Sequence, residues 1–203
     1  MTSTPNVVII DSGGANLASV GYAFARLGVE TRVTCDADRI RSADRVVLPG
    51  VGNAASVMTR LNNYALVPVI RSLQCPVLGV CLGMQLLFEW SAEGSTTSLG
   101  LIPGRIEALS SHADLPVPHM GWNTTKTRMD DPLLEGLSGD DWFYFVHSFA
   151  APLSAEHTLA STQYGSEFSS IVRHANFWGV QFHPERSGKS GMRLLSNFLK
   201  LKS

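Results

Sequence analysis

One cysteine lies at a predicted sharp turn, and it is the first residue of this sequence to suggest chemistry. Residues 76–85 read PVLGVCLGMQ, so an apolar run enters a Gly-x-Cys-x-Gly pattern and an apolar helical pattern follows. This is the layout of a nucleophile elbow, with the sulfur of Cys81 in place of the usual serine oxygen. Gly79 and Gly83 leave space for a reactive side chain at so tight a turn. The pattern predicts that Cys81 is a nucleophile.

The expected position of Cys81 at the start of a helix favours reactivity. Unpaired N–H groups and the positive end of the helix dipole stabilise a thiolate there. The N–H of Leu82 would lie beside an oxyanion formed at an attacked carbonyl group. The alternative stays open that Cys81 is a buried, unreactive cysteine, because that is the usual environment of a free cysteine.

A histidine and a glutamate near the C-terminus complete a possible catalytic set, in the segment Phe182-His183-Pro184-Glu185. Pro184 disfavours a helix at His183, and side chains two residues apart in an extended segment face the same way. Glu185 would then bind one ring nitrogen of His183 while the other nitrogen faces Cys81. General-base help of this kind contributes ~10²–10⁴ in rate. A surface histidine beside a carboxylate is the alternative.

The glycine-rich loop 49–53, which reads PGVGN, is a candidate for oxyanion and substrate binding. Glycine lets the backbone approach a substrate, so Gly50, Val51 and Gly52 are candidates for binding the substrate and its oxyanion. An inward-facing amide near Val51 and Gly52 would contribute roughly 3 kcal/mol as a second oxyanion donor. As an alternative, the loop is an ordinary turn between a strand and a helix.

Two polar residues after the elbow are candidates for holding an amino-acid substrate. Gln85 lies one helical turn beyond Cys81 and would face the same cleft. Glu93 follows the predicted helix, and either side chain would accept a hydrogen bond from an ammonium group. Both are also consistent with ordinary solvated residues.

Composition predicts one globular domain covering residues 1–203. Hydrophobic residues make up 44% and charged residues 16% of the 203, and the net charge is −1. The scattered basic residues exclude a nucleic-acid stripe, and the apolar runs are too short for a membrane span. The N-terminus lacks the features of a signal peptide, so a cytoplasmic location is expected. Three cysteines without C-x-x-C spacing predict neither a disulfide framework nor a metal site, and we expect no cofactor.

Strand and helix patterns alternate in the first half, which predicts an α/β fold with a central, mostly parallel sheet flanked by helices. The expected strands are 6–10, 29–34, 45–48 and 77–80, and the expected helices are 15–27, 54–61, 64–73 and 82–90. The C-terminal half is predicted to add a β-rich, antiparallel section, with strands at 106–109, 119–124, 142–149, 157–164, 170–174 and 178–182. A final helix is expected at 191–199.

Three of the candidate segments follow predicted parallel strands. Asp11, the loop 49–53 and Cys81 each come at the carboxyl end of a strand, where ligands of open parallel sheets bind. They are therefore expected to share one edge of the sheet. A phosphate cradle at Asp11 and the glycine turn after it is a further alternative, although the G-x-G-x-x-G and P-loop spacings are absent.

The two main motifs resemble those of the class I glutamine amidotransferases, which carry a Cys-His-Glu triad on an α/β sheet. The matching segments are 79–85 and 182–185. Within this family the chain is similar to the glutaminase subunits of imidazole glycerol phosphate synthase, of histidine biosynthesis. That finer similarity spans most of the chain and is carried by segments 10–17, 118–123 and 144–149.

The resemblance implies a role for each matching residue. Cys81 would be the nucleophile, His183 the base and Glu185 the group that orients it. Glutamine would be held by Gly50, Gly52, Gln85 and Glu93, and by backbone at His147, Ser148 and Phe149. Ammonia would pass to a β/α-barrel cyclase subunit in a heterodimer, faced by Asn16, Trp122, Asn123, Tyr144 and Arg186. The family often has tyrosine where this chain has Ser12.

Two other functions are compatible with these residues. The first is another cysteine hydrolase on the same fold, such as a peptidase-like enzyme or the glutaminase of vitamin B6 synthesis. The second is a non-catalytic scaffold subunit, which would predict a broken triad. Without the resemblance, Trp122 and Tyr144 would be assigned to the core because they lie in strand patterns.

Overall fold

The computed structural model describes residues 4–13, 16–50, 52–110 and 115–202. Within them, the main sheet has eight strands in the order β2-β1-β3-β4-β14-β13-β12-β9. The first five are parallel: β2 (Thr31–Thr34), β1 (Val7–Ile10), β3 (Arg45–Gly50), β4 (Val77–Cys81) and β14 (Phe177–Val180). The last three are antiparallel: β13 (Ser166–His174), β12 (Thr158–Tyr164) and β9 (Lys126–Thr127). The predicted α/β class with a mostly parallel sheet is confirmed.

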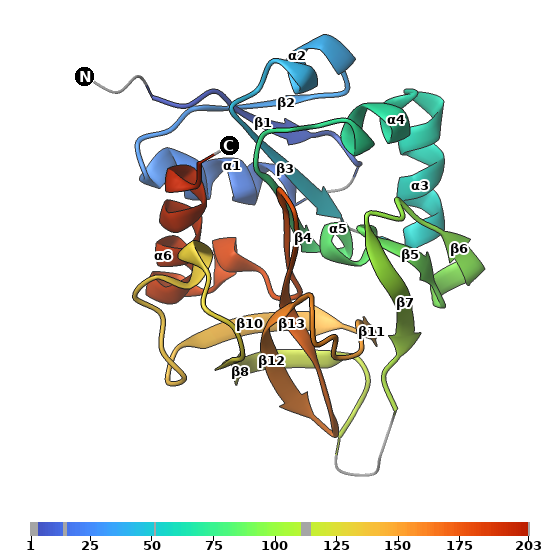
Figure 1. The fold of residues 1–203 in the computed structure, drawn as a ribbon, viewed down its shortest axis with the longest axis vertical. Coiled ribbons are helices and arrows are strands. Elements are labelled where there is room, and N and C mark those ends of the chain that lie inside the picture. Colours follow the sequence, from blue (N-terminus) through green and yellow to red (C-terminus); the bar gives the residue numbers. More distant parts are fainter. Residues whose placement is uncertain (1–3, 14–15, 51, 111–114, 203) are drawn as a thin grey trace.

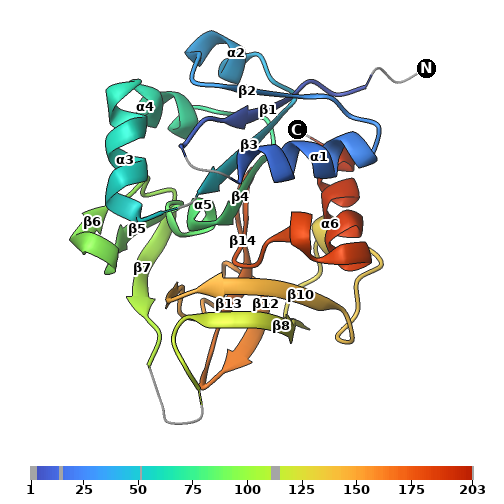
Figure 2. The same cartoon turned by 180° about the vertical axis from the view of Figure 1, so that it is seen from behind.

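Helices cover both faces of the parallel strands (Figure 1). On one face lie α1 (Leu17–Arg26) and α6 (Gly188–Lys200), and on the other α2 (Ala37–Arg41), α3 (Ala54–Asn63) and α4 (Leu66–Arg71). Figure 2 shows the same layers from behind. Alternation within β1 explains the two layers, because Val7 and Ile9 pack with the α1 and α6 side while Val8 and Ile10 pack with the α3 and α4 side. Strands buried on both faces read as continuous apolar runs.

Two smaller sheets flank the main one. The strands β8 (His119–Thr124) and β10 (Trp142–His147) form an antiparallel pair in full register. A four-stranded sheet has the order β11-β7-β5-β6, with β11 at Phe149–Ala150, β7 at Ile102–Ala108, β5 at Phe88–Ser91 and β6 at Thr96–Thr97. Single 3₁₀ turns lie at Glu93–Ser95, Pro132–Leu134 and Pro184–Arg186. The antiparallel strands of the C-terminal half therefore partly extend the main sheet and partly form these two sheets.

The predicted helix 82–90 is wrong beyond its first turn. Helix α5 spans only Leu82–Gln85, and the chain then turns into β5. The buried run Leu86, Leu87 and Phe88 misled the prediction, because a short apolar run does not distinguish a buried helix from a buried strand. Pairing with β6 and β7 decides that residues 88–91 form a strand, because those two strands supply the partners for its backbone hydrogen bonds.

The helix α2 was not predicted. It is short, and its first turn is capped by the Asp36 side chain, which accepts hydrogen bonds from the N–H groups of Asp38 and Arg39. No helix in the described ranges is long and apolar enough to cross a membrane.

The turn between β4 and α5 allows no side chain at Gly83. A Cβ atom there would overlap the backbone carbonyl of Leu48 on β3. We expect Gly83→Ala to lower the free energy of unfolding by about 2 kcal/mol, because the overlap outweighs the helix propensity that alanine adds. Chemical denaturation measures the change. Gly139→Ala is the matched control, since a Cβ at Gly139 meets nothing within 4 Å. Equal stabilities for the two variants would contradict this account of the turn.

Candidate active site

The Cys81 backbone has a conformation that side-chain-bearing residues rarely adopt. Its φ is 54° and its ψ is −112°, at the junction of β4 and α5. Such a conformation costs about 1–3 kcal/mol and persists where the surroundings enforce it. Here they do, because a Cβ at Gly79 would come within 2.7 Å of the Gly83 carbonyl. The close approach of the two glycines holds the Cys81 side chain at the carboxyl end of β4.

The His183 ring and the Glu185 carboxylate are in direct contact. Nδ1 of His183 lies 2.8 Å from Oε1 of Glu185, and both side chains are nearly inaccessible to solvent. The prediction that the whole segment from His183 to Glu185 is extended is wrong in its second half. His183 is extended, but residues Pro184–Arg186 form a 3₁₀ turn. The turn, rather than strand alternation, folds the carboxylate back onto the ring.

The position of His183 is further set by its backbone. Its N–H donates to the carbonyl of Tyr144 at 2.9 Å, and its carbonyl accepts from the Ser187 hydroxyl at 2.7 Å. The hydroxyl oxygen of Ser187 in turn accepts the N–H of Tyr144 at 3.0 Å. Ser187 therefore ties this segment to β10, a role that nothing in the sequence pattern indicates.

The side chain of Asn16 lies beside the histidine–glutamate pair. Its Nδ2 donates to Oε1 of Glu185 at 2.7 Å and lies 3.3 Å from Nδ1 of His183. From the sequence, Asn16 was expected only on the partner-facing surface. The structure brings it to the carboxylate that contacts His183, where it contributes a second donor to that carboxylate.

The pKa values favour a charged histidine–glutamate pair at neutral pH. Burial by itself lowers the pKa of His183, but the interactions with Cys81 and Glu185 outweigh burial and raise that pKa to about 10. Burial raises the pKa of Glu185, and His183 and then Asn16 outweigh it, so this pKa lies below its ordinary value. The ring can therefore donate a proton near Cys81 before it accepts one.

Two cavities meet at Cys81. Gly52, Leu82 and Val146 line both of them together with Cys81. The larger, of about 370 Å³, also has Asn16, Ser19, Gly50, His183 and Arg186 in its wall. The smaller, of about 250 Å³, is completed by Gln85, Glu93, Pro118, His147, Ser148 and Phe149. Cys81 thus lies where the cavity that is also lined by His183 meets a second hollow. Val51 lies outside the described residues.

The two predicted ammonium acceptors differ in what they already bind. Oε2 of Glu93 accepts the N–H of Ala54 at 2.7 Å, at the start of α3. The Gln85 side chain donates to the carbonyl of Phe149 at 2.8 Å and to Oε1 of Gln181 at 3.0 Å. Gln85 therefore organises the wall of the smaller cavity as well as reaching it.

Gln181 was not among the predicted site residues. It is fully buried, and its Nε2 donates to Sγ of Cys81 at 3.8 Å. It precedes His183 by two residues just after β14, so alternation could have placed both on the side of Cys81. The sequence does not show that β14 pairs with β4, the strand that ends at Cys81, and without that pairing Gln181 could not be assigned to the site.

The outer face of the β8–β10 pair is aromatic and exposed. Trp122 is 53% exposed, and its ring contacts that of Tyr144 edge to face with centroids 6.0 Å apart. The Arg186 guanidinium lies 5.8 Å from the Tyr144 ring centroid. Assigning Trp122 to the core from its strand pattern is therefore wrong. Asn123 faces inward, where its Nδ2 donates to the carbonyl of Gln163 at 3.1 Å.

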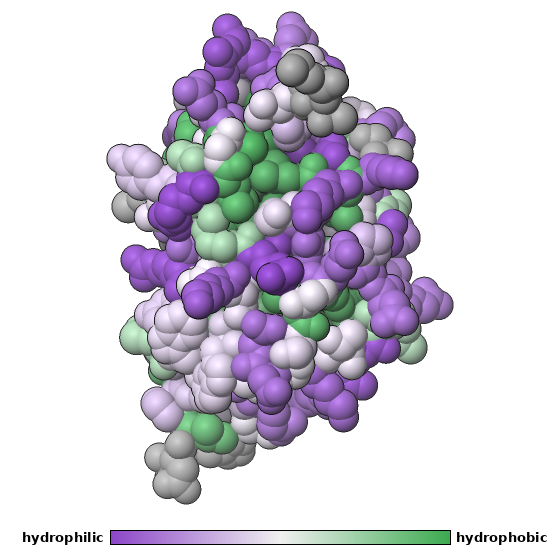
Figure 3. All heavy atoms as spheres, turned by 90° about the vertical axis from the view of Figure 1, so that its left-hand side faces the viewer, coloured by the Kyte–Doolittle hydropathy of each residue, from purple (hydrophilic) through white to green (hydrophobic). Residues whose placement is uncertain are grey.

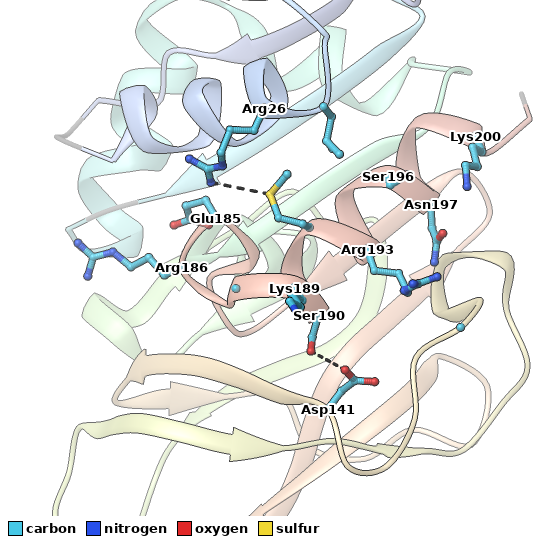
Figure 4. A pocket seen from close by; sticks show the side chains of 14 residues that line it. Arg26, Asp141, Glu185, Arg186, Lys189, Ser190, Arg193, Ser196, Asn197 and Lys200 are labelled. Atoms are coloured by element: carbon cyan, nitrogen blue, oxygen red, sulfur yellow. Dashed lines mark hydrogen bonds between the residues drawn. The ribbon is translucent and has the colours of Figure 1, made fainter.

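A larger hollow, of about 970 Å³, lies along α6, and neither Cys81 nor His183 lines it (Figure 4). Its labelled basic side chains are Arg26, Arg186, Lys189, Arg193 and Lys200. Ser190 donates to Asp141 at its edge. Figure 3 shows the face on which α1 and α6 lie, where hydrophilic side chains form a band across the middle. The hollow along α6 is therefore a polar surface groove, and the site around Cys81 is the better candidate for catalysis.

Comparison with known proteins agrees with this geometry. The model of the family described as glutamine amidotransferase class-I matches residues 8–201. The chain belongs to this family. The predicted membership in the class I glutamine amidotransferases is thereby confirmed.

Two curated relatives of this class I amidotransferase carry the name imidazole glycerol phosphate synthase subunit HisH. The one from Idiomarina loihiensis is 52% identical over 196 residues, which cover 97% of this chain and 98% of the relative. The one from Pasteurella multocida is 48% identical over 195 residues, covering 96% and 98%.

Solved structures share the amidotransferase fold at lower identity. A crystal structure described as that of a glutamine amidotransferase superposes with a TM-score of 0.74 at 19% identity, covering 96% of this chain and 97% of the other. The glutaminase domain of Trypanosoma brucei CTPS with bound acivicin gives a TM-score of 0.68 at 15% identity, covering 98% of this chain and 96% of the other.

Within the described part of the chain, no three His, Cys, Asp or Glu side chains gather as a metal site requires.

Two buried histidines beside the site predict a loss of stability in mild acid. Burial lowers the pKa of His119 to about 4 and that of His147 to about 3, whereas both would titrate near 6.5 when unfolded. Between pH 6.5 and these values the unfolded chain binds more protons, so stability falls as the pH falls. His183, with its raised pKa, acts in the opposite direction between pH 7 and pH 5, because the unfolded chain gains most of a proton that the folded chain already holds, and it offsets about 1 kcal/mol of the loss. We expect a loss of roughly 2 kcal/mol per histidine from pH 7 to pH 5, measured by denaturant titration. A flat profile over this range would contradict the neutral, buried state of the two rings.

Proposed function

We propose that this chain is the glutaminase subunit of an imidazole glycerol phosphate synthase. It hydrolyses glutamine to glutamate and ammonia, and the ammonia passes to a cyclase subunit in histidine biosynthesis. The observation that carries the proposal is that one cavity is lined by both Cys81 and the buried His183, whose ring contacts the Glu185 carboxylate at 2.8 Å. The near-complete coverage of relatives named HisH supports the choice of this synthase over other ammonia-using enzymes.

The first half of the reaction forms a thioester. The Cys81 thiolate attacks the side-chain amide carbon of glutamine, and the carbonyl oxygen becomes an oxyanion that accepts a hydrogen bond from the N–H of Leu82. His183 donates its proton to the amide nitrogen, the carbon–nitrogen bond breaks, and ammonia leaves. Glu185 keeps the ring oriented and stabilises its positive charge beforehand.

The second half releases glutamate. A water molecule gives a proton to His183 and attacks the thioester carbon. The carbon–sulfur bond then breaks, so glutamate departs and the sulfur and the protonated ring return to their starting state. A second oxyanion donor in the loop 49–53 would act in both halves.

The smaller cavity is the proposed seat of the amino-acid end of glutamine. Glu93 supplies a carboxylate for the substrate ammonium group, and Gln85 lies in the same wall. His147, Ser148 and Phe149 also line this cavity, and their backbone is proposed to help hold the substrate. This arrangement would leave the side-chain amide of glutamine at Cys81, where the two cavities meet.

The exposed aromatic face of β8 and β10 is the proposed docking surface for a β/α-barrel cyclase in a heterodimer. Met120 and Trp122 are exposed by 62% and 53%, and Arg186 joins this face to the larger cavity. Aromatic and arginine side chains dominate the binding energy of many interfaces. A partner docked on this face would lie beside the larger cavity, through which ammonia would leave Cys81. A cytoplasmic location, as expected for such a biosynthetic enzyme, remains a prediction.

Removal of the sulfur tests the proposed chemistry. Cys81→Ala is expected to reduce glutamate release by ~10⁴-fold or more when the cyclase is present, because no other group forms the thioester. Cys75→Ala is the control: Cys75 is a free thiol outside both cavities and should leave the rate unchanged. Full turnover by Cys81→Ala would exclude the proposed mechanism.

The docking surface has its own test. We expect Trp122→Ala to weaken cyclase binding about 30-fold, the size typical of a lost interface anchor, as measured by calorimetry. Glutamate release by the isolated chain should not change, since Trp122 lines neither cavity. Tyr64→Ala, an exposed aromatic at the end of α3, should bind as the unaltered protein does. If both variants bind equally well, the partner docks elsewhere.

A further inference from the structure

A chain of hydrogen bonds runs inward from β8 to the wall of the smaller cavity. Nδ2 of Asn123 lies 3.4 Å from Nε2 of His119, and Nδ1 of His119 lies 3.0 Å from Nε2 of His147. Nδ1 of His147 lies 2.9 Å from the carbonyl oxygen of Phe149. Both histidines are buried, and the chain connects the inner face of β8 to the segment after β10.

The direction of each hydrogen bond follows from the two ends of the chain. The carbonyl oxygen of Phe149 can only accept, so His147 carries its proton on Nδ1 and its Nε2 must accept from His119. His119 then also carries its proton on Nδ1, and its bare Nε2 accepts from the Asn123 amide. That amide nitrogen is fixed at the other end because it also donates to the carbonyl of Gln163.

The same network continues to the sulfur. The carbonyl of Phe149 also accepts Nε2 of Gln85, whose second proton goes to Oε1 of Gln181. This contact turns Nε2 of Gln181 toward Cys81, 3.8 Å from Sγ. A single carbonyl, that of Phe149, therefore links the histidine pair to the amides that reach the nucleophile.

The surroundings of His119 hold its ring in place and in its neutral form. The ring stacks on Tyr164 with centroids 4.0 Å apart and on Phe145 at 4.8 Å. Burial lowers the pKa of both histidines far below neutrality. Protonation of His147 would bring two N–H groups face to face between the rings, and protonation of His119 would set its Nε2–H against the amide of Asn123.

Alternation along β8 relates this network to the proposed docking surface. Met120 and Trp122 face outward, whereas His119 and Asn123 lie on the opposite, inward face of the same strand. A small displacement of β8 on docking would therefore move both sets of side chains together. His119 lines neither cavity at Cys81, so any effect on the reaction has to pass through its neighbours.

We propose that His119 is a positioning residue for the reaction: with Asn123 and His147 it forms a hydrogen-bonded relay that couples strand β8 to the Phe149 carbonyl and to Cys81. The role of the relay in partner coupling rests on the proposed function. The hydrogen-bond geometry of the relay in the unbound chain is independent of that function.

Two matched substitutions separate the relay from simple packing. In His119→Asn the amide nitrogen takes the place of Nδ1 and can still donate to His147. In His119→Gln the amide reaches the place of Nε2, and the donor toward His147 is lost. We expect His119→Gln to lower the kcat of glutamate release in the cyclase complex about tenfold, with KM changed less than about threefold, while His119→Asn stays within about threefold of the unaltered complex. Equal activities for the two variants, or a loss confined to KM, would overturn the proposal.

A spectroscopic readout tests the relay without catalysis. Nitrogen-15 spectra of histidine-labelled protein at pH 7 should show both His119 and His147 neutral and protonated on Nδ1. Protonation of either ring on Nε2 would overturn the assigned direction. The alkylation rate of Cys81 by iodoacetamide, followed by mass spectrometry, should change in His119→Gln and not in His119→Asn. Equal alkylation rates for the two variants would refute the link to the sulfur.

The outcomes for the relay and for the proposed function are distinguishable. An unaltered complex that releases no glutamate would defeat the proposed function, whereas the spectra and alkylation rates would still decide the relay. An active complex in which His119→Gln behaves as His119→Asn does would defeat the relay alone. Should either variant unfold, the spectra of the unaltered protein still decide the direction of the bonds.

Discussion

The contact between the turn after β4 and the neighbouring strand β3 is the constraint on which the site depends. The backbone of Gly83 packs directly against the carbonyl of Leu48, and Gly79 packs against Gly83. This closeness sets the start of α5 and the unusual backbone angles of Cys81. The interior is packed as densely as a crystal, so such a turn has no room to relax. The turn therefore fixes the position of the Cys81 sulfur, and the other polar groups of the site lie around it.

Two hydrogen-bond systems lie beside that sulfur. One runs from Asn16 through Glu185 to the His183 ring and carries charge. The other runs from the Phe149 carbonyl through Gln85 to Gln181 and is neutral. Buried polar groups are costly unless they are paired, so both systems also stabilise the packing of the strands that carry them. Together they give Cys81 two different neighbours, a proton donor in the His183 ring and a fixed amide in Gln181.

Sequence patterns predicted the architecture better than the details of the site. The parallel half was predicted because alternating apolar strands and helices have few other solutions. The helix 82–90 was wrong because Leu86 and Leu87 are buried in either structure, and pairing of β5 decides between them. The expected strand geometry of His183 and Glu185 was wrong because a 3₁₀ turn begins at Pro184. Gln181 and Ser187 escaped notice because each acts through a distant partner.

What the sequence determined by itself is local: a cysteine between two glycines at a strand end, and a histidine followed by proline and glutamate. These patterns depend on steric space and short-range backbone preferences, which neighbouring residues decide. Only the tertiary structure decided that β14 lies beside β4, which brings Gln181 and His183 to Cys81. It also decided that Trp122 faces solvent while His119 is buried, because exposure depends on what packs against each face of β8. Such contacts join residues far apart in the chain, and their energy exists only when the whole sheet is assembled.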